Sequence, residues 1–256
     1  MYAERASLLD GAVVWHNEPG PGPAVPVLPD GCMDLLWTEG RLLIAGPDTR
    51  AQPPDGPRAA WAGVRFPPGA APAFFGVPAH ELRDLRVDLS DVWPARQVRS
   101  LAEQVTDSPD RVAALEAVAL RYSADTPPPD PLLRAVVEGL DAGGTVASTA
   151  AAVGLGARQL HRRSLDAFGY GPKTLARVLR LQRALAFVRD GVPYAGAALA
   201  AGCSDQAHLA REMRDLTGLT LGRYAELTSG SWPVNSSGSW PANSDTPAPS
   251  GSRTTA

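Results

Sequence analysis

The side chains best suited to chemistry in this chain are basic ones gathered in a short stretch. Residues 155–183 hold seven basic side chains and one acidic one, although the whole chain of 256 residues has a formal net charge of −3. Six of the seven are arginines, whose planar guanidinium can donate two parallel hydrogen bonds to a phosphate or to the O6/N7 edge of guanine. The cluster favours a polyanionic partner such as duplex DNA. In the alternative interpretation, the arginines only keep an exposed helix solvated.

An internal repeat connects this cluster with a second set of polar side chains. Three residues recur after 49 positions, where Leu160, Arg162 and Gly169 return as Leu209, Arg211 and Gly218. Each copy reads as an alanine-rich helix, a turn with a small residue and a second amphipathic helix, over 147–169 and 197–218. The first helix must be slim so that the second can pack across it. The repeat therefore predicts two helix-turn-helix units.

The second helix of each unit carries the side chains that could read bases. On the helix expected over 157–168, Leu160 and Leu165 pack inward, which leaves one short face to Arg158, His161 and Arg162. The corresponding positions of the second copy hold Gln206, His208 and Arg211. Arginine pairs well with guanine and glutamine with adenine in the major groove. These two faces are the predicted base-reading surfaces.

A connecting helix is expected between the two helix-turn-helix units. Pro172 suits a first helical turn, where the missing N–H is not needed, and Asp190-Gly191 ends the pattern. Such a helix would hold the two units at a set separation. Further contacts to DNA are expected from three basic side chains, Arg163, Lys173 and Arg177.

The first half of the chain has a different composition. Residues 1–127 hold 11 basic and 17 acidic side chains, and 19 of the 25 prolines lie at or before position 131. Short apolar runs alternate with turn residues, at 13–15, 33–37, 42–45, 61–66, 73–77 and 85–89, as is typical of strands. Helical spacing follows at 98–105 and 112–118. We expect an α+β chain, with a small antiparallel barrel or sandwich plus one or two helices before an all-α C-terminal part.

The first half also holds residue types that catalyse reactions or bind metals. His16 and His80 are 64 positions apart, and Glu81 beside His80 would point to the opposite face of a strand. Cys32 has no histidine nearby to activate it, so we expect a buried structural cysteine. Asp30 and Asp34 could form a carboxylate pair, but a turn and a strand end explain them more simply. We predict a binding unit with no catalytic residue, no cofactor and no metal.

Composition divides the chain into four segments. We predict a β-rich domain over 1–126, a Pro-rich linker over 127–131, a DNA-binding domain over 132–228 and a disordered tail over 229–256. The run Thr126-Pro127-Pro128-Pro129 favours extended polyproline conformation and acts as a semi-rigid spacer. The tail repeats SGSWPVNS as SGSWPANS and holds few apolar residues. A plain extension and a partner-binding peptide are the two interpretations of this repeat.

The second half resembles a known family. Residues 202–214 (GCSDQAHLAREMR), followed by Thr217-Gly218-Leu219-Thr220, resemble the C-terminal signature of AraC-family transcription regulators. Residues 158–163 (RQLHRR) and 168–172 (FGYGP) are similar to the first helix-turn-helix of that family, in which a serine usually stands at the position of Gly156. The resemblance implies recognition helices that enter successive major grooves. It assigns Arg158, His161 and Arg162 to one half-site, and Gln206, Ala207, His208 and Arg211 to the other.

The first half resembles the uncharacterised N-terminal domain found on many AraC-type regulators. The similarity lies in residues 27–37 (VLPDGCMDLLW), 45–49 (AGPDT) and 63–70 (GVRFPPGA). It implies a cupin-like sensor or dimerisation domain over about residues 5–120, without a known ligand.

These observations predict a bacterial sequence-specific transcription regulator that is not an enzyme. Its expected partners are double-stranded DNA, a small-molecule effector, a second copy of the chain and, for an activator, RNA polymerase. One alternative is a barrel enzyme or DNA-repair protein with an appended DNA-binding domain, but neither Cys32 nor Cys203 has a basic neighbour that would activate it. Another is a protein-interaction module whose basic helices meet an acidic partner.

The sequence also predicts the cellular compartment of the protein. No stretch reaches the roughly 18 apolar residues of a membrane helix, and Glu4, Arg5 and Asp10 argue against a secretory signal. We therefore expect no membrane partner and a cytoplasmic protein.

Overall fold

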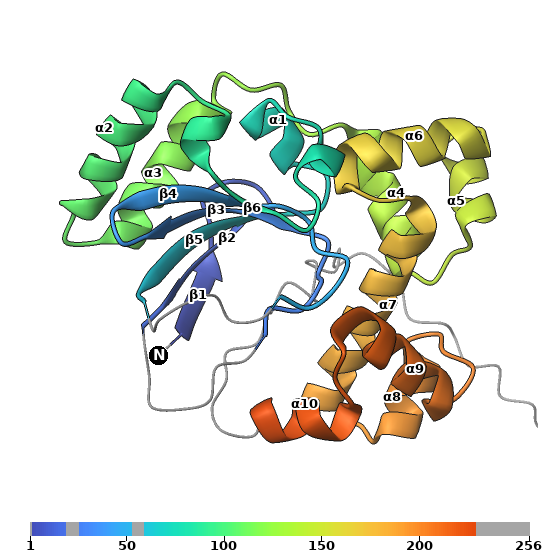
Figure 1. Cartoon of the computed structure of the whole chain (residues 1–256). Coiled ribbons are helices and arrows are strands. Elements are labelled where there is room, and N and C mark those ends of the chain that lie inside the picture. The colour runs from blue at the N-terminus through green and yellow to red at the C-terminus, as the bar shows by residue number, and fades with distance from the viewer. Residues whose placement is uncertain (1, 19–25, 53–58, 229–256) are drawn as a thin grey trace, which may run out of the picture.

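A computed structural model describes residues 2–18, 26–52 and 59–228 (Figure 1). One antiparallel sheet has the strand order β1-β2-β5-β3-β4-β6. Its strands are β1 (Tyr2–Ala6), β2 (Val13–Asn17), β3 (Met33–Thr38), β4 (Arg41–Ala45), β5 (Trp61–Phe66) and β6 (Arg86–Asp88). Helices α2 (Ala95–Thr106) and α3 (Arg111–Ser123) cover one face of the sheet. We call the part from β1 to α3 the sheet unit.

Side-chain alternation separates the two faces of the sheet. Leu35 on β3 lies opposite Ile44 on β4 and Val64 on β5, and all three are completely buried in the core beneath α2 and α3. The preceding residue Asp34 lies opposite Arg65, so this pair belongs to the other face. The apolar core thus lies between sheet and helices, and charged residues lie on the opposite face.

The sheet unit agrees with the expected β-rich fold but differs in two details. Within the described residues the sheet is open, with β1 and β6 at its edges, and a layer of helices covers one face. The apolar run 73–77, grouped with the strands above, belongs instead to the short helix α1 (Ala71–Phe75). Pro72 occupies the first turn of α1, and Gly76 ends it with a φ of +76°. Two single turns, η1 (Ala79–Glu81) and η2 (Leu89–Asp91), follow.

The C-terminal part is entirely helical among the described residues, and we call it the helical unit. Its elements are α4 (Pro131–Asp141), α5 (Val146–Ala152), α6 (Ala157–Phe168), α7 (Pro172–Arg189), α8 (Tyr194–Ala200), α9 (Gln206–Thr217) and α10 (Leu221–Thr228). The predicted pairs are present as α5–α6 and α8–α9, with α7 connecting them. The proline run lies between α3 and α4, and the expected tail over 229–256 lies outside the described residues.

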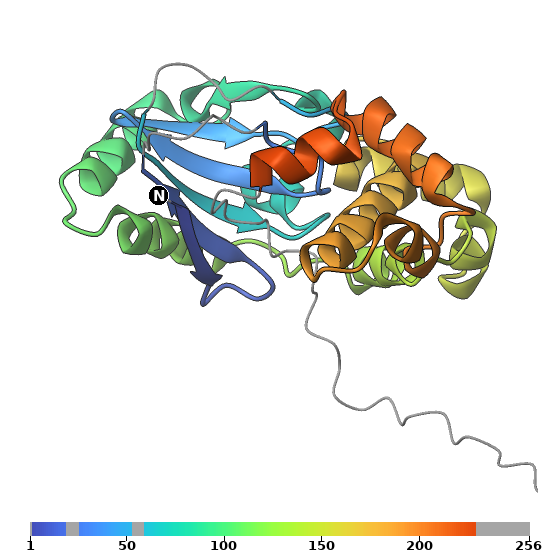
Figure 2. The ribbon, with the colours of Figure 1, turned by 90° about the horizontal axis from the view of Figure 1, so that it is seen from below.

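The sheet unit and the helical unit lie side by side (Figure 2). Each has its own apolar core. Leu28 comes from the chain segment before β3, yet it is buried in the core of the helical unit. The two units are therefore in direct contact.

Candidate DNA-binding interface

The first helix-turn-helix unit consists of α5 and α6. The Thr145 hydroxyl caps α5 by accepting a backbone N–H of its first turn at 3.0 Å. The turn passes through Gly154, whose φ of +67° is left-handed and favours glycine. α6 begins after Gly156, whose N–H donates to the Gln159 side chain at 3.1 Å. Leu160 is completely buried, which confirms the predicted inward face of α6.

The predicted reading face of α6 is open to solvent. Arg158, His161 and Arg162 are all exposed. A Cβ on Gly171 would come within 2.7 Å of the His161 ring, so the glycine lets the imidazole lie against the start of α7. The two arginines are exposed, and within the described residues neither has a hydrogen bond or an ion pair, so each is sterically available to a partner.

The second unit repeats this arrangement in α8 and α9. The Asp205 carboxylate caps α9 by accepting the His208 N–H at 2.6 Å, and the turn passes through Gly202 with a φ of +84°. The half-buried His208 ring folds back over the helix start, because its Nδ1 accepts the Ser204 N–H at 3.2 Å. Three of the four predicted reading residues are exposed, namely Gln206, Ala207 and Arg211.

A buried carboxylate fixes α9 to α7. Glu212 is only 8% exposed, and its two oxygens lie 2.9 Å from Arg177 Nε and 3.2 Å from Arg180 Nη2. Arg177 also pairs with Asp215 at 3.2 Å. A buried charge with two partners strongly resists separation, because removing a partner would leave it uncompensated. Arg177, predicted to contact DNA, is therefore engaged within the chain, whereas Lys173 is exposed.

A shallow depression of about 630 Å³ lies between the two helix-turn-helix units. It is lined by the loop before α5 and by α7 and α9, through residues that include Gly144, Thr145, Lys173, Arg177, His208 and Asp215. Arg163 lies elsewhere, exposed on α6 and 3.4 Å from Asp130 at the start of α4. The predicted basic residues thus flank the units at several places rather than forming one cluster.

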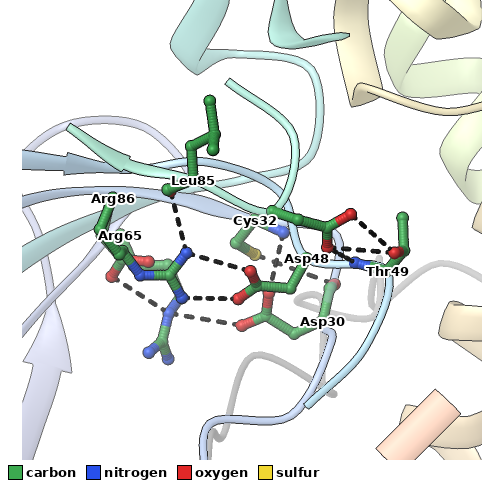
Figure 3. Close-up of polar contacts among 9 residues, drawn as sticks. Asp30, Cys32, Asp48, Thr49, Arg65, Leu85 and Arg86 are labelled. Atoms are coloured by element: carbon green, nitrogen blue, oxygen red, sulfur yellow. Dashed lines mark hydrogen bonds and ion pairs between the residues drawn. The ribbon is translucent and has the colours of Figure 1, made fainter. Parts of the chain in front are cut away.

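Charged side chains also meet at the end of the sheet that faces the helical unit (Figure 3). Arg65 is buried, with its Nε 3.5 Å from Asp30 and 3.4 Å from Asp34. Arg86 forms a close pair with Asp48 at 2.7 Å. Asp30 and Asp34 do lie together, but they share a buried arginine that was not predicted from the sequence, although an arginine within the otherwise apolar run 61–66 was a detectable signal.

Neither of the two cysteines is activated as a nucleophile. Cys32 is buried beside this charged group, and burial together with Asp30 raises the pKa of its thiol well above the usual value. A high pKa disfavours the nucleophilic thiolate. Cys203 is also buried, and burial raises the pKa of its thiol too. Cys32 is buried, as expected, and Cys203 packs in the core of the helical unit.

The metal-ligand candidates remain apart. His16 lies on β2, whereas His80 and Glu81 lie in η1. Across the described ranges, no group of three or more His, Cys, Asp or Glu side chains could hold a metal ion. In the same part of the chain, no helix has the length and apolar character needed to cross a bilayer.

Comparisons with known proteins agree with this geometry. The helix-turn-helix domain family matches residues 149–226, and a domain of unknown function matches residues 12–88. The chain is 30% identical to a probable AraC family transcriptional regulator from Rhodopseudomonas palustris CGA009, over 36% of this chain and 91% of that one, with a TM-score of 0.31. No curated protein matches the sequence.

Two solved structures of ToxT from Vibrio cholerae strain SCE256 are more distant. An apo variant is 8% identical, over 87% of this chain and 99% of that one, with a TM-score of 0.47. Wild-type ToxT bound to an unsaturated fatty acid is 9% identical, over 88% and 95%, with a TM-score of 0.45.

Two helix-turn-helix units joined by one helix define a DNA-binding transcription regulator. Because the chain spans nine-tenths of the Rhodopseudomonas regulator at 30% identity, it belongs to the AraC family of transcriptional regulators.

Proposed function

We propose that this regulator reads two short DNA motifs about one helical turn apart. Arg158, His161 and Arg162 on α6 would read one motif. The other would be read from α9 by Gln206, Ala207, His208 and Arg211. The observation that carries the proposal is the exposure of both reading faces at the start of helices whose opposite faces are buried.

The chemistry of these side chains supports different roles within the interface. Arg158, Arg162 and Arg211 can each donate two parallel hydrogen bonds to guanine, and a good pair of this kind contributes about 1–3 kcal/mol of discrimination. Gln206 suits adenine, whereas Ala207 offers only apolar contact, for example to a thymine methyl group. Arg163, Lys173 and Arg177 would contact phosphates, which position the protein without reading sequence. For Arg177 this requires competition with Glu212 and Asp215.

The sheet unit is proposed to act as a sensor or dimerisation domain. In this proposal, residues 1–126 form the sensor or dimerisation domain, residues 127–131 form the linker and residues 132–228 form the DNA-binding domain. The separate apolar core of the sheet unit supports an independent role. A small-molecule effector, a second copy of the chain and, for an activator, RNA polymerase are the proposed further partners. Since bacterial DNA lies in the cytoplasm, the proposal also places the protein there.

Selection from random duplex DNA tests this function. We expect the purified full chain to enrich two short motifs about one turn apart. Arg162→Ala and Arg211→Ala are each expected to weaken binding to the selected duplex at least tenfold, because each removes a bidentate contact. Fluorescence anisotropy at two salt concentrations measures the loss.

Arg99→Ala is the matched control, since it removes an exposed arginine from α2, far along the chain from both recognition helices. Equal losses for Arg99→Ala and Arg162→Ala would contradict the assigned reading face. Binding without enrichment of any motif would indicate a non-specific DNA-binding protein, and no binding at low salt would contradict the proposal altogether.

A further inference from the structure

The sheet unit touches the C-terminal ends of both recognition helices. At α6, His80 Nδ1 lies 3.5 Å from Asp166 Oδ1, and Arg83 Nη1 donates to the Gly169 carbonyl at 3.3 Å. At α9, the Ala51 N–H donates to the carbonyl of Leu216 at 2.9 Å. A single unit thus contacts two helices that lie in separate helix-turn-helix units.

The sheet unit also holds the connecting helix. The Gln182 side chain on α7 is buried and donates to the Pro29 carbonyl at 2.6 Å. The neighbouring Leu28 is buried in the core of the helical unit. Two backbone hydrogen bonds, at 2.9 and 3.0 Å, join Val27 to Gln52. The segments that contact α7 and α9 are therefore fastened to each other.

The charged group at the end of the sheet anchors these segments (Figure 3). The Asp48 carboxylate is held by Arg86 on β6, and the backbone N–H of Thr49 donates to Asp84 at 2.7 Å. Asp30 pairs with the buried Arg65. Buried charged contacts of this kind resist displacement, since breaking one leaves a charge without its partner. The contact segments are therefore tied to the sheet through the Arg65–Asp30 and Arg86–Asp48 pairs.

α6 packs against the sheet unit as well as within the helical unit. Its contact with η1 is more extensive than its contact with the connecting helix α7. By contrast, α9 is fastened to α7 through Glu212. The angle between the two recognition helices is therefore set by contacts on two sides, α7 on one and the sheet unit on the other.

We propose that the sheet unit is a spacing clamp, which fixes the separation of α6 and α9 and so selects the distance between the two DNA motifs. Arg83 and the Ala51 backbone are its positioning groups, and Gln182 on α7 is the residue through which α7 is held to Pro29. The inference rests on the proposed function, because spacing matters only when both helices bind DNA. One base pair shifts a motif by 3.4 Å and turns it by about 35° around the duplex. A rigidly held pair of helices cannot follow such a shift, whereas a loosened pair can.

The test measures binding of the full chain to duplexes that carry both selected motifs at the preferred spacing and at one base pair more or less. The wild type is expected to prefer its own spacing at least tenfold. In the double variant Arg83→Ala/Gln182→Leu, we expect this ratio to fall below threefold, with affinity at the preferred spacing nearly kept. The ratio compares DNA molecules on one protein sample, so a partly unfolded variant does not change it.

Two glycines provide a matched pair of variants. Gly169 and Gly218 end α6 and α9, both with left-handed φ values, of +79° and +69°. A Cβ on Gly169 would lie 2.5 Å from Pro47 Cγ of the sheet unit, whereas a Cβ on Gly218 would meet nothing within 4 Å. Both alanine variants carry similar backbone strain. Only Gly169→Ala is expected to flatten or move the spacing preference.

An unchanged spacing ratio in both Arg83→Ala/Gln182→Leu and Gly169→Ala would overturn the clamp while leaving sequence-specific binding intact. Tighter binding at every spacing would also overturn it, because the contacts would then inhibit DNA binding instead of setting its geometry. A wild type that selects no motif would overturn the proposed function itself, and the clamp with it.

Discussion

Glu116 on α3 shows how one residue anchors the N-terminal strand. Its carboxylate accepts from the Arg5 guanidinium at 2.6 Å, the Ser7 hydroxyl at 2.7 Å and the Leu8 N–H at 2.7 Å. The Arg5 hydrogen bond is the main cause that lowers the pKa of Glu116 to about 2. Because the folded-state pKa lies below the unfolded one, this contribution to stability is present above about pH 4.5 and is lost as the pH falls towards 2.

Replacing this carboxylate tests the anchor. Glu116→Gln is expected to lower the free energy of unfolding at pH 7 by at most about 3 kcal/mol, and the difference from wild type should shrink as the pH falls from about 4.5 towards 2. Urea unfolding at several pH values measures it. Glu103→Gln, at an exposed position of α2, is the control and should change little. A difference that stays constant down to pH 2 would show that the charge of Glu116 is not the cause.

At the scale of elements, the helix-turn-helix pairs follow from local signals. Gly154 and Gly202 both have the left-handed backbone conformation that the turn requires, and Pro172 occupies the first turn of α7. The run 73–77 lies at the end of α1 and not in the predicted strand, because apolar runs of this length fit a strand or a buried helix equally well. β1 was missed since residues 2–6 alternate weakly and form an edge strand that depends on its neighbour β2.

Helix capping yields a prediction for α6. Side chains cap α5 and α9, whereas Gly156 at the start of α6 offers none. Its φ of −70° suits any residue, and a Cβ there would meet only the Gln159 side chain, at 3.6 Å. Gly156→Ser is expected to add a few tenths of a kcal/mol of stability, or about 1 °C in melting temperature.

Thermal melting followed by circular dichroism measures this effect. Gly156→Ala is the control, because alanine has a Cβ but no oxygen to accept an N–H, and it should lower the melting temperature. If serine and alanine shift it in the same direction, the capping hydrogen bond is not responsible.

At the scale of the whole molecule, the contact between the two units has a thermodynamic consequence. Leu28 belongs to the sheet unit by sequence but is 8% exposed within the core of the helical unit. Leu28→Ala is expected to cost about 2–3 kcal/mol. Because the side chain joins the two units, we expect both to unfold at lower urea concentration.

Two probes separate the units in this measurement. Residues 1–126 hold four of the six tryptophans and residues 132–228 hold none, so fluorescence reports the sheet unit once Trp232 and Trp240 are replaced by phenylalanine. Far-UV circular dichroism reports mainly the helices. Leu8→Ala is the control, because it removes a leucine that is 81% exposed, and the urea midpoints of both transitions should stay unchanged. A shift of only one transition would show that the units unfold independently.

The sequence by itself determined the class of the helical unit. Periodicity, glycine turns and caps are signals between residues close in the chain, and the repeat shows the same local pattern twice. Together they predict α5 to α9 and the exposed faces with Arg162 and Arg211. Only the tertiary structure brought Asp48 to Arg86, Arg177 to Glu212 and Leu28 into the helical core. These contacts join residues 35 or more positions apart in the sequence. Which of these distant residues come into contact is decided by how the folded chain buries its side chains. The pairing of the two units is therefore a property of packing that no local pattern encodes.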